Sequence, residues 1–434
     1  MDTTTRIEPA VPAPSDALTR RAFRKAIFRL VPILTFAFVL NYLDRTNIGF
    51  AAITMNKDLG LSNTAFGWGA GVLFFGYCTF EVPSNWAMYK VGARRWLARI
   101  MITWGVLSAA TALVTGPSGF YALRFLLGVA EAGFVPGAMV LFAMWFPAQY
   151  RSRLLSWFQM SVPVASLISG PLSTTILRMN SAWGLAGWQW LFITEGLPAA
   201  IIGVLILFVV TDSPADAGWL SAEEKTAISD AVAAEQRDRS VHRFSSALID
   251  KRVLMLAAIQ LGFTIGSYGV AIWLPLILKG HDLSTTAVGW LASIPYLCGC
   301  VATVTWSAHV DRTGQRTNNL ILACLVGAIG LVTSVLFASL AMSLIGICVA
   351  LMGITAARGI FWSIPPRFLA GMGAAGGLAL INSIGTLGGF FGPAVMGWLK
   401  DATGSFNIGL LIMAGLIALS AVLTLLLRLL LQQD

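Results

Sequence analysis

Long apolar runs are the feature of this sequence that most constrains its fold. Runs of about 20 residues, the length that an α-helix needs to cross a bilayer, recur along most of the chain. Only 11% of the 434 residues are charged, whereas a soluble globular protein carries about 25%. Because the chain cannot supply a polar surface for a water-soluble fold, it is predicted to be an all-α integral membrane protein.

The runs predict twelve membrane-spanning helices in two sets of six. The first set falls near residues 27–53, 64–88, 96–115, 119–143, 153–177 and 187–210, and the second near 253–279, 286–308, 318–339, 343–366, 374–398 and 406–430. The longest polar segment separates the two sets, and Ser221-Ala222-Glu223-Glu224 inside it is typical of a helix start. The predicted organisation is a disordered head at 1–22, a six-helix bundle at 23–210, a linker with a short surface helix at 211–251 and a six-helix bundle at 252–434.

The net charge of +9 does not indicate nucleic-acid binding, because the basic residues gather in short clusters between apolar runs. Loops rich in Lys and Arg face the cytoplasm, so this alternation predicts that both termini are cytoplasmic and that membrane lipid is the partner of the surface. The clusters are Arg20, Arg21, Arg24 and Lys25; Lys90, Arg94, Arg95 and Arg99; and Arg151 and Arg153.

No ligand set for a metal or a cofactor is expected. The five cysteines lie in apolar stretches, and the Cys298-x-Cys300 pair lacks the spacing of a four-ligand site. The three histidines fall in loops or at the end of a span. An intramembrane enzyme therefore has no visible catalytic group, and no segment resembles the filter loop of a channel.

Two features recur at one offset and predict an internal duplication. Gly92 after the second span corresponds to Gly314 after the eighth (314 − 92 = 222). Gly170-Pro171 in the fifth span corresponds to Gly392-Pro393 in the eleventh at the same offset (392 − 170 = 222). Two unrelated features that share an offset indicate two pseudo-symmetric halves.

Ionisable residues inside the spans are the candidates for function, because burying charge in a membrane is costly. Asp44 and Arg45 fall in the first span, and Arg124 and Glu131 lie seven residues apart on one face of the fourth, with Gly128 between them. A carboxyl group balanced between burial and a nearby arginine can take up and release a proton, and the guanidinium fork matches a carboxylate. The alternative is that these four residues form structural ion pairs.

Other buried polar residues leave two interpretations open. Arg358 in the tenth span either adds a positive charge for a dianionic substrate, or it reaches a membrane interface or pairs with a structural acid. Glu81 and Glu195 lie nearer to span ends, where structural hydrogen bonds are the favoured interpretation. Gln159 is a weaker candidate, since a buried amide commonly joins helices, and Trp362 fits ordinary packing equally well.

Four segments resemble signatures of the anion:cation symporter family in the major facilitator superfamily, and of its tartrate and phthalate permease branch. They are Asn41–Ala51, Arg124–Pro136, Trp190–Pro198 and Ala379–Gly385. The loops after the second and eighth spans are similar to the loop motif of that superfamily, although Tyr89 stands where an acid is expected. The residues that carry this motif are Gly92, Arg94, Asp311, Arg312, Gly314 and Arg316.

The resemblance implies the major facilitator fold and a monomeric, proton-coupled importer of a small organic carboxylate in the inner membrane of a bacterium. Exchange or export of organic anions is the alternative. Asp44 and Glu131 match the proton-coupling acids of the family. The matching or candidate substrate residues are Arg45, Arg124, Tyr77, Trp362, Asn382, Tyr42, Tyr268, Gln159 and Arg358, the last of which departs from the family pattern.

Overall fold

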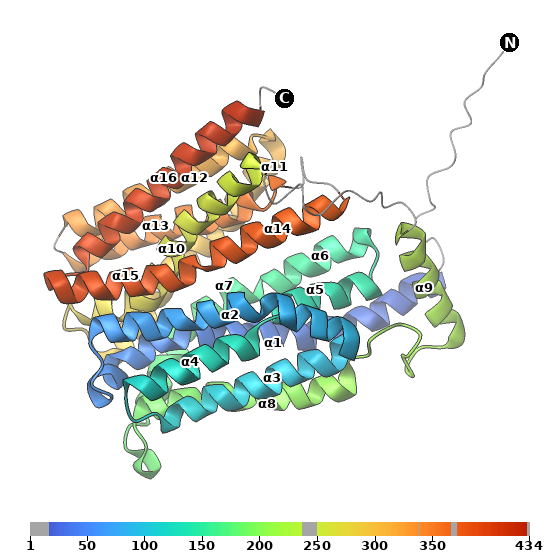
Figure 1. The fold of residues 1–434 in the computed structure, drawn as a ribbon, viewed down its shortest axis with the longest axis horizontal. Coiled ribbons are helices and arrows are strands. Elements are labelled where there is room, and N and C mark those ends of the chain that lie inside the picture. Colours follow the sequence, from blue (N-terminus) through green and yellow to red (C-terminus); the bar gives the residue numbers. More distant parts are fainter. Residues whose placement is uncertain (1–16, 237–249, 338, 366–370, 432–434) are drawn as a thin grey trace.

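The computed structural model describes residues 17–236, 250–337, 339–365 and 371–431, and these are almost entirely helical (Figure 1). Two groups of helices lie side by side, with α9 at one end of the molecule; that end is called the α9 end below (Figure 1). The first group is α1 (Ala17–Asp58), α2 (Asn63–Val91), α3 (Ala93–Ala110), α4 (Pro117–Glu131), α5 (Phe134–Trp145), α6 (Ala148–Gln159), α7 (Ser161–Leu177) and α8 (Gly187–Val209). After α9 (Ala222–Gln236), the second group is α10 (Lys251–Lys279), α11 (Thr285–Thr313), α12 (Arg316–Leu336), α13 (Leu340–Phe361), α14 (Gly371–Thr386), α15 (Gly388–Thr403) and α16 (Asn407–Leu431).

Among the described residues, eleven helical stretches are long and apolar enough to cross a membrane. Three of them contain two helices in line, namely α4 with α5, α6 with α7, and α14 with α15. The 29-residue α2 lies alongside these stretches and is the twelfth of these rods, as we call the membrane-spanning helical stretches (Figure 1). It is about 43 Å long at a rise of about 1.5 Å per residue. The predicted fold class of twelve membrane helices is therefore confirmed.

The predicted disorder of residues 1–22 is wrong for its last part, because α1 begins at Ala17. Packing explains the longer helix. Ala22 and Phe23 are 0% and 1% exposed, and the Phe23 ring lies 4.7 Å from the ring of Tyr150. Residues 1–16 lie outside the described part of the chain.

A clasp holds α9 against the first group of helices. Lys25 Nζ donates to both carboxylate oxygens of Glu224 at 2.6 and 2.9 Å. Ser221 and Glu224 form reciprocal hydrogen bonds at the start of α9, 3.0 and 3.2 Å long, which satisfy two free backbone N–H groups. The Trp219 ring stacks on Trp145 with their centroids 5.4 Å apart. The start of the linker is therefore part of the first group.

The clasp should loosen at acidic pH. Hydrogen bonds from Lys25 and from the Ser221 backbone hold the pKa of Glu224 below its ordinary value of about 4.3. The contribution of the Glu224 carboxylate to the stability of the clasp is complete above this ordinary pKa. It is lost as the pH falls through the lower pKa that Glu224 has in the clasp. In Glu224→Gln at neutral pH, we expect the backbone amides of α9 to exchange hydrogen about fivefold faster, since one partly exposed ion pair stabilises by about 1 kcal/mol.

Hydrogen exchange followed by mass spectrometry measures this protection, and acidified wild-type protein should also lose protection of α9 once the rates are corrected for the intrinsic effect of pH on amide exchange. Glu223→Gln is the matched control, because the exposed Glu223 precedes Glu224 in the same helix. Equal protection of α9 in the two variants would contradict the clasp.

Glycines bring the two groups of helices into backbone contact toward the end opposite α9. A Cβ atom added to Gly170 would lie 2.2 Å from the carbonyl oxygen of Gly289, and one added to Gly67 would lie 2.4 Å from that of Pro393. These contacts are related by the predicted repeat, because Gly67 and Gly289 are 222 residues apart (289 − 67), as are Gly170 and Gly392. The duplicated Gly-Pro motifs are thus the places where one half meets the other.

Asp401 at the end of α15 closes this opposite end. Its carboxylate accepts hydrogen bonds from the backbone N–H groups of Asn63 and Thr64 at 3.3 and 2.7 Å. It also accepts from Asn63 Nδ2 and Thr64 Oγ1 at 2.7 and 2.6 Å. The first-turn N–H groups of a helix lack intrahelical partners and attract negative charge, so this contact is a latch between the halves.

Replacing Asp401 with asparagine should open the latch, because the neutral amide presents an NH₂ group to donors. In a cysteine-free background, we expect Ala394→Cys, beside the contact of Gly67 with α15, to react several-fold faster with a maleimide when Asp401→Asn is present. Asp282→Asn is the control, since Asp282 is an acid at the same end whose φ of +58° suits asparagine. An unchanged labelling rate would count against the latch.

Candidate transport site

A break in the fourth rod places Glu131 at the end of α4. Gly133 has a φ of +90°, which side-chain-bearing residues rarely adopt, and α5 begins at the next residue. Ser84 Oγ donates to the Ala132 carbonyl at 2.5 Å and in turn accepts from Trp96 Nε1 at 3.0 Å. The break falls where Gly133, Pro136 and Gly137 lie within five residues, and it is held from α2 and α3.

Glu131 and Arg45 form an ion pair in the interior of the first group. Arg45 Nε donates to Glu131 Oε2 at 2.9 Å, and Asn41 Nδ2 donates to the same oxygen at 3.0 Å. Glu131 is 0% exposed. The Arg45 guanidinium also lies over the Tyr77 ring, 4.8 Å from its centroid. The partner of Glu131 is thus Arg45 from α1 and not Arg124, which shares its helix face.

Asp44 points away from Arg45, as the turn of about 100° between adjacent helical residues predicts. Ser108 of α3 donates a short hydrogen bond to Asp44 Oδ1, and Oδ2 has no hydrogen-bond partner. Arg124 is 1% exposed, is attracted to Asp44 and Glu131, and has two guanidinium nitrogens, Nε and Nη1, without a partner. The cluster therefore holds unused donors and acceptors.

Gly128 makes room for a neighbouring helix. A Cβ atom at this position would lie 2.0 Å from the carbonyl oxygen of Leu73 and 3.0 Å from the backbone nitrogen of Tyr77. The space beside Gly128 is filled by the backbone of α2 and not left for a bound group. This close approach brings Tyr77 to Arg45.

Arg358 reaches the first group from α13. Its Nη2 donates to Ser267 Oγ at 3.1 Å, and its guanidinium lies 5.9 Å from the centroid of Tyr268. The charge of Arg358 also acts on Tyr42 of α1. The Tyr268 ring also packs on Phe74 of α2, with centroids 4.4 Å apart. Arg358 therefore lies where the two groups meet and not at a membrane interface.

The remaining candidates differ in position. Asn382 Nδ2 donates to Glu81 Oε1 at 3.3 Å, so this pair also bridges the two groups. Trp362 lies just after α13, is 37% exposed and packs its ring on Phe361 at 5.4 Å. Gln159 at the end of α6 is exposed, so the buried amide considered for this position is wrong.

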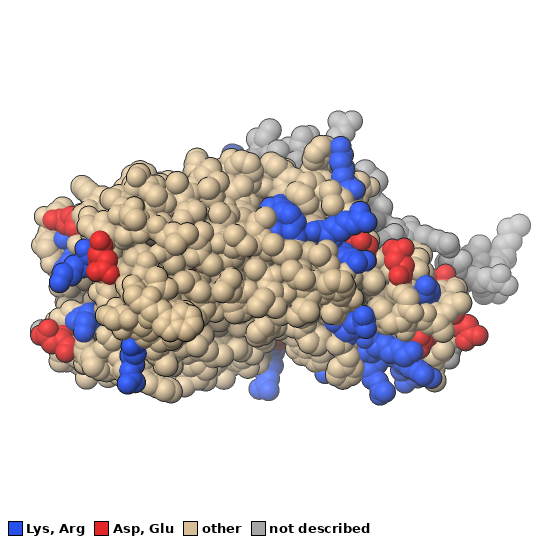
Figure 2. Space-filling model, turned by 90° about the horizontal axis from the view of Figure 1, so that it is seen from below, with Lys and Arg blue, Asp and Glu red and all other residues tan. Residues whose placement is uncertain are grey.

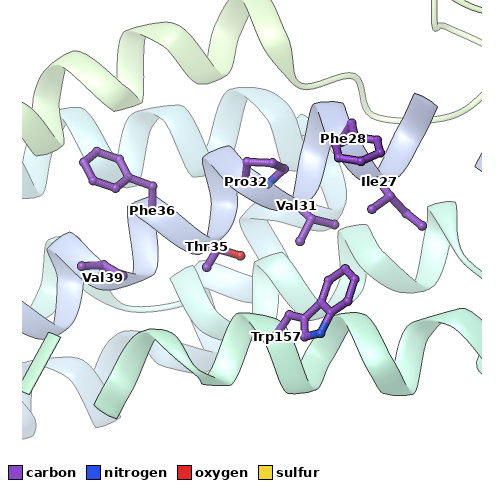
Figure 3. A pocket seen from close by; sticks show the side chains of 8 residues that line it. All are labelled: Ile27, Phe28, Val31, Pro32, Thr35, Phe36, Val39 and Trp157. Carbon is purple, nitrogen blue, oxygen red and sulfur yellow. The ribbon is translucent and has the colours of Figure 1, made fainter. Parts of the chain in front are cut away.

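An apolar groove lies between α1 and α6 toward the α9 end. Figure 3 shows Trp157 of α6 facing Val31 and Thr35 of α1 across it. Thr35 and Gly49 are 14 residues apart and so project within about 40° of each other on α1. Because Gly49 packs on the Ile272 backbone of α10, the groove lies on the face of α1 that meets the second group. Its other lining residues are Ile27, Phe28, Pro32, Phe36 and Val39.

The two loop motifs lie at the α9 end and differ in their partners. Gly92 has a φ of +94°, and the Arg94 backbone N–H donates to Asp212 Oδ1 at 2.7 Å. Asp212, which follows α8, thus caps α3 in a loop whose own sequence lacks the expected acid. In the second loop Gly314 has a φ of +67°, and Arg316 Nη1 donates to the Ser363 carbonyl at 2.8 Å. Asp311 and Arg312 are exposed at the end of α11.

Comparisons with known proteins place this geometry in a family. The family described as Major Facilitator Superfamily matches residues 34–379. The chain is 47% identical over 412 residues to a protein named "Putative tartrate transporter" from Agrobacterium vitis, covering 94% of this chain and 92% of that one. It is 39% identical to a "Quinolone resistance transporter" from Acinetobacter baumannii, covering 92% and 93%.

Solved structures agree on the fold. The inward-open xylose transporter XylE from E. coli superposes with a TM-score of 0.75 at 18% identity, covering 92% of this chain and 95% of that one. A bacterial homologue of the human lysosomal transporter Spinster, inward-facing and occupied, gives 0.74 at 15% identity, covering 94% and 97%. These similarities extend over both groups of helices.

Proposed function

Because the chain belongs to the Major Facilitator Superfamily of membrane transporters, we propose that it imports a small organic carboxylate together with protons. The single observation that carries the proposal is the buried ion pair of Arg45 and Glu131. Transport proceeds by alternating access, in which the two groups of helices expose a central site first to one side of the membrane and then to the other.

Protonation of Glu131 is the proposed coupling step. While Glu131 is ionised, its carboxylate occupies the Arg45 guanidinium at 2.9 Å. A proton on Glu131 removes that negative charge, and Arg45 then binds the substrate carboxylate in its place, because an unpaired buried guanidinium is costly. Asp44 takes the second proton-coupling role beside Arg124, whose free nitrogen atoms offer further donors.

A dicarboxylate fits the site best. Arg45 from the first group lies over the Tyr77 ring and Arg358 from the second lies 5.9 Å from the centroid of Tyr268, so each group supplies a positive charge. Asn382 adds an amide that can bond a substrate hydroxyl group, as a hydroxy acid such as tartrate requires. The name of the Agrobacterium relative supports the same class. Trp362 and Gln159 are proposed to line the path of the substrate.

The α9 end is proposed to face the cytoplasm. Lys and Arg side chains gather there around α9 (Figure 2), and basic residues are retained on the cytoplasmic side of a membrane. Both termini then lie in the cytoplasm, in the inner membrane of a bacterium. The latch at Asp401 closes the outer side, and the groove beside Trp157 forms part of the inner vestibule.

Uptake by reconstituted vesicles tests the proposal. Vesicles that contain the protein should accumulate labelled tartrate when the outside is acidic, and a protonophore should abolish the accumulation. Phthalate and succinate, added as competitors, rank hydroxy acids against aromatic and simple dicarboxylates. Accumulation that persists after the pH gradient collapses would rule out proton coupling.

Exchange or export of organic anions is the second candidate, favoured by the relative named as a quinolone resistance transporter. Gradients, and not the site, set the direction of such a carrier. Counterflow of labelled tartrate into tartrate-loaded vesicles at equal pH, without any accumulation on a proton gradient, would favour this candidate.

A further inference from the structure

Glu195 is a buried carboxyl group in the first group of helices, apart from the two that the proposed coupling uses. Glu195 of α8 is 4% exposed. Its Oε2 accepts a hydrogen bond from Asn47 Nδ2 at 2.9 Å, and its Oε1 accepts one from Ser173 Oγ at 3.3 Å. Among the described residues no Lys or Arg forms an ion pair with it, and the charge that acts on it is that of Asp44, which is also negative.

One face of α1 connects the three carboxyl groups. Asn41, Asp44 and Asn47 follow one another at intervals of three residues, about 4.5 Å of helix rise per step. Asn41 bonds Glu131, and Asn47 bonds Glu195. Since α1 starts at the α9 end, Glu131 lies nearest that end, Asp44 lies between, and Glu195 lies nearest the opposite end.

Charge balance assigns a proton to Glu195. Among the described residues, four carboxyl groups are buried in the first group, and one of them, Glu81, is bonded by Asn382 of the second group. The other three share only two buried guanidinium groups, those of Arg45 and Arg124. Arg45 pairs with Glu131, and Arg124 is attracted to Asp44 and Glu131. An unpaired carboxylate in a dry interior is strongly disfavoured, so the third group is neutral and carries the proton.

The seam between α3 and α8 fixes this arrangement. A Cβ atom on Gly196 would lie 2.7 Å from the backbone nitrogen of Ala109 and 2.7 Å from the carbonyl oxygen of Gly105. The neighbouring residues on the two helices are Glu195 and Ser108, the donor to Asp44. Glu195 and Asp44 therefore both lie in the first group and are linked through the packing of α8 on α3.

We propose that Glu195 is the proton-entry residue, which takes a proton from the side opposite α9 and passes it to Asp44. In this step the O–H bond of the Glu195 carboxyl breaks and an O–H bond forms at Asp44 Oδ2, the oxygen without a hydrogen-bond partner. The Glu195 carboxylate then takes the next proton from the water on that side. The inference rests on the proposed proton coupling and adds a third titrating group to it.

Glu195→Gln tests the assignment, because glutamine has nearly the same shape and its amide oxygen can still accept from Asn47, but it cannot carry the proton. In vesicles of the full chain, we expect the initial rate of proton-driven tartrate uptake to fall about 100-fold, a typical effect of removing a proton-transfer group. Tartrate exchange at equal pH should continue at the wild-type rate. Glu223→Gln in the exposed face of α9 is the matched control and should leave both rates unchanged.

Infrared spectroscopy gives a readout that needs no substrate. The spectrum of the wild-type protein at acidic minus alkaline pH should contain a protonated-carboxyl band that is missing from Glu195→Gln and present in Glu223→Gln. Wild-type uptake rates in Glu195→Gln, or an unchanged difference spectrum, would overturn the proposal. If the wild-type protein itself shows no proton-driven uptake, the proposed function fails, and the difference spectra still decide whether Glu195 titrates.

Discussion

Replacing Glu131 with glutamine is expected to abolish proton-driven accumulation of tartrate while tartrate exchange at equal pH continues. Glutamine imitates the protonated acid, so Arg45 stays available to the substrate in every state of the cycle. The carrier can still alternate between its inward-facing and outward-facing states with substrate bound, but this change no longer requires a proton. The concentration of tartrate inside the vesicles should therefore fall to that of the surrounding solution.

The same variant separates the proposed role from a structural ion pair. If Glu131 serves only to hold Arg45, its loss leaves a buried guanidinium without its partner and destabilises the protein by about 3–5 kcal/mol. Exchange and accumulation would then disappear together, and the thermal denaturation midpoint of the purified protein would drop. A variant that accumulates tartrate as the wild type does would exclude Glu131 from coupling.

Replacing Gly128 with alanine is expected to have the largest effect on the fold. The added Cβ atom would lie 2.0 Å from the Leu73 carbonyl oxygen, and backbone on both sides leaves no flexible side chain to move aside. Overpacking of this kind costs about 1–3 kcal/mol or more. Because Tyr77 follows Leu73 by one helical turn, the shift also withdraws its ring from Arg45, and transport should be lost with stability.

Gly415→Ala is the matched control for this prediction. Gly415 is also helical, and an added Cβ atom there meets nothing within 4 Å. Alanine restricts the unfolded chain and favours a helix, so this variant should be neutral or more stable by up to about 1 kcal/mol. Thermal denaturation of the two purified proteins measures the difference, and equal midpoints would contradict the packing of α2 on α4.

The rods of this fold could be predicted closely, because the bilayer imposes one length and one polarity on each of them. Both ends of α2, for example, lie within a few residues of the predicted span at 64–88. The break at Gly133 was also predictable, since two glycines and a proline within five residues disfavour a continuous helix. The extension of α1 to Ala17 was not, because it depends on contacts with Tyr150 that no local pattern reveals.

The polar residues of the candidate site could be predicted by type but not by partner. Helix periodicity puts Arg124 and Glu131 on one face, yet the ion pair joins Glu131 to Arg45 of another helix. Pairing between helices depends on how α1 and α4 rotate against each other, which the spacing of either helix leaves open. The sequence does predict that Asp44 and Arg45 point in different directions, because the angle between adjacent residues is fixed within a single helix.

The partners of three acids could not be predicted for the same reason. Asp212 caps α3 across 118 residues of sequence. Glu81 meets Asn382 of the other group, and Glu195 meets Asn47 of α1. One signal was available in the sequence, since Asn41, Asp44 and Asn47 repeat at an interval of three residues inside an apolar helix. A polar face of this kind in a membrane span predicts polar partners on the helices around it.

The glycine contacts between the halves are suited to rotation of one half against the other. Where Gly67 meets Pro393 and Gly170 meets Gly289, backbone slides on backbone, so rotation of one half needs no interlocked side chains to change rotamer. The few polar contacts between the halves, such as those of Asp401, then set the balance between orientations. We expect gain or loss of a single hydrogen bond there, about 1 kcal/mol, to shift that balance about fivefold.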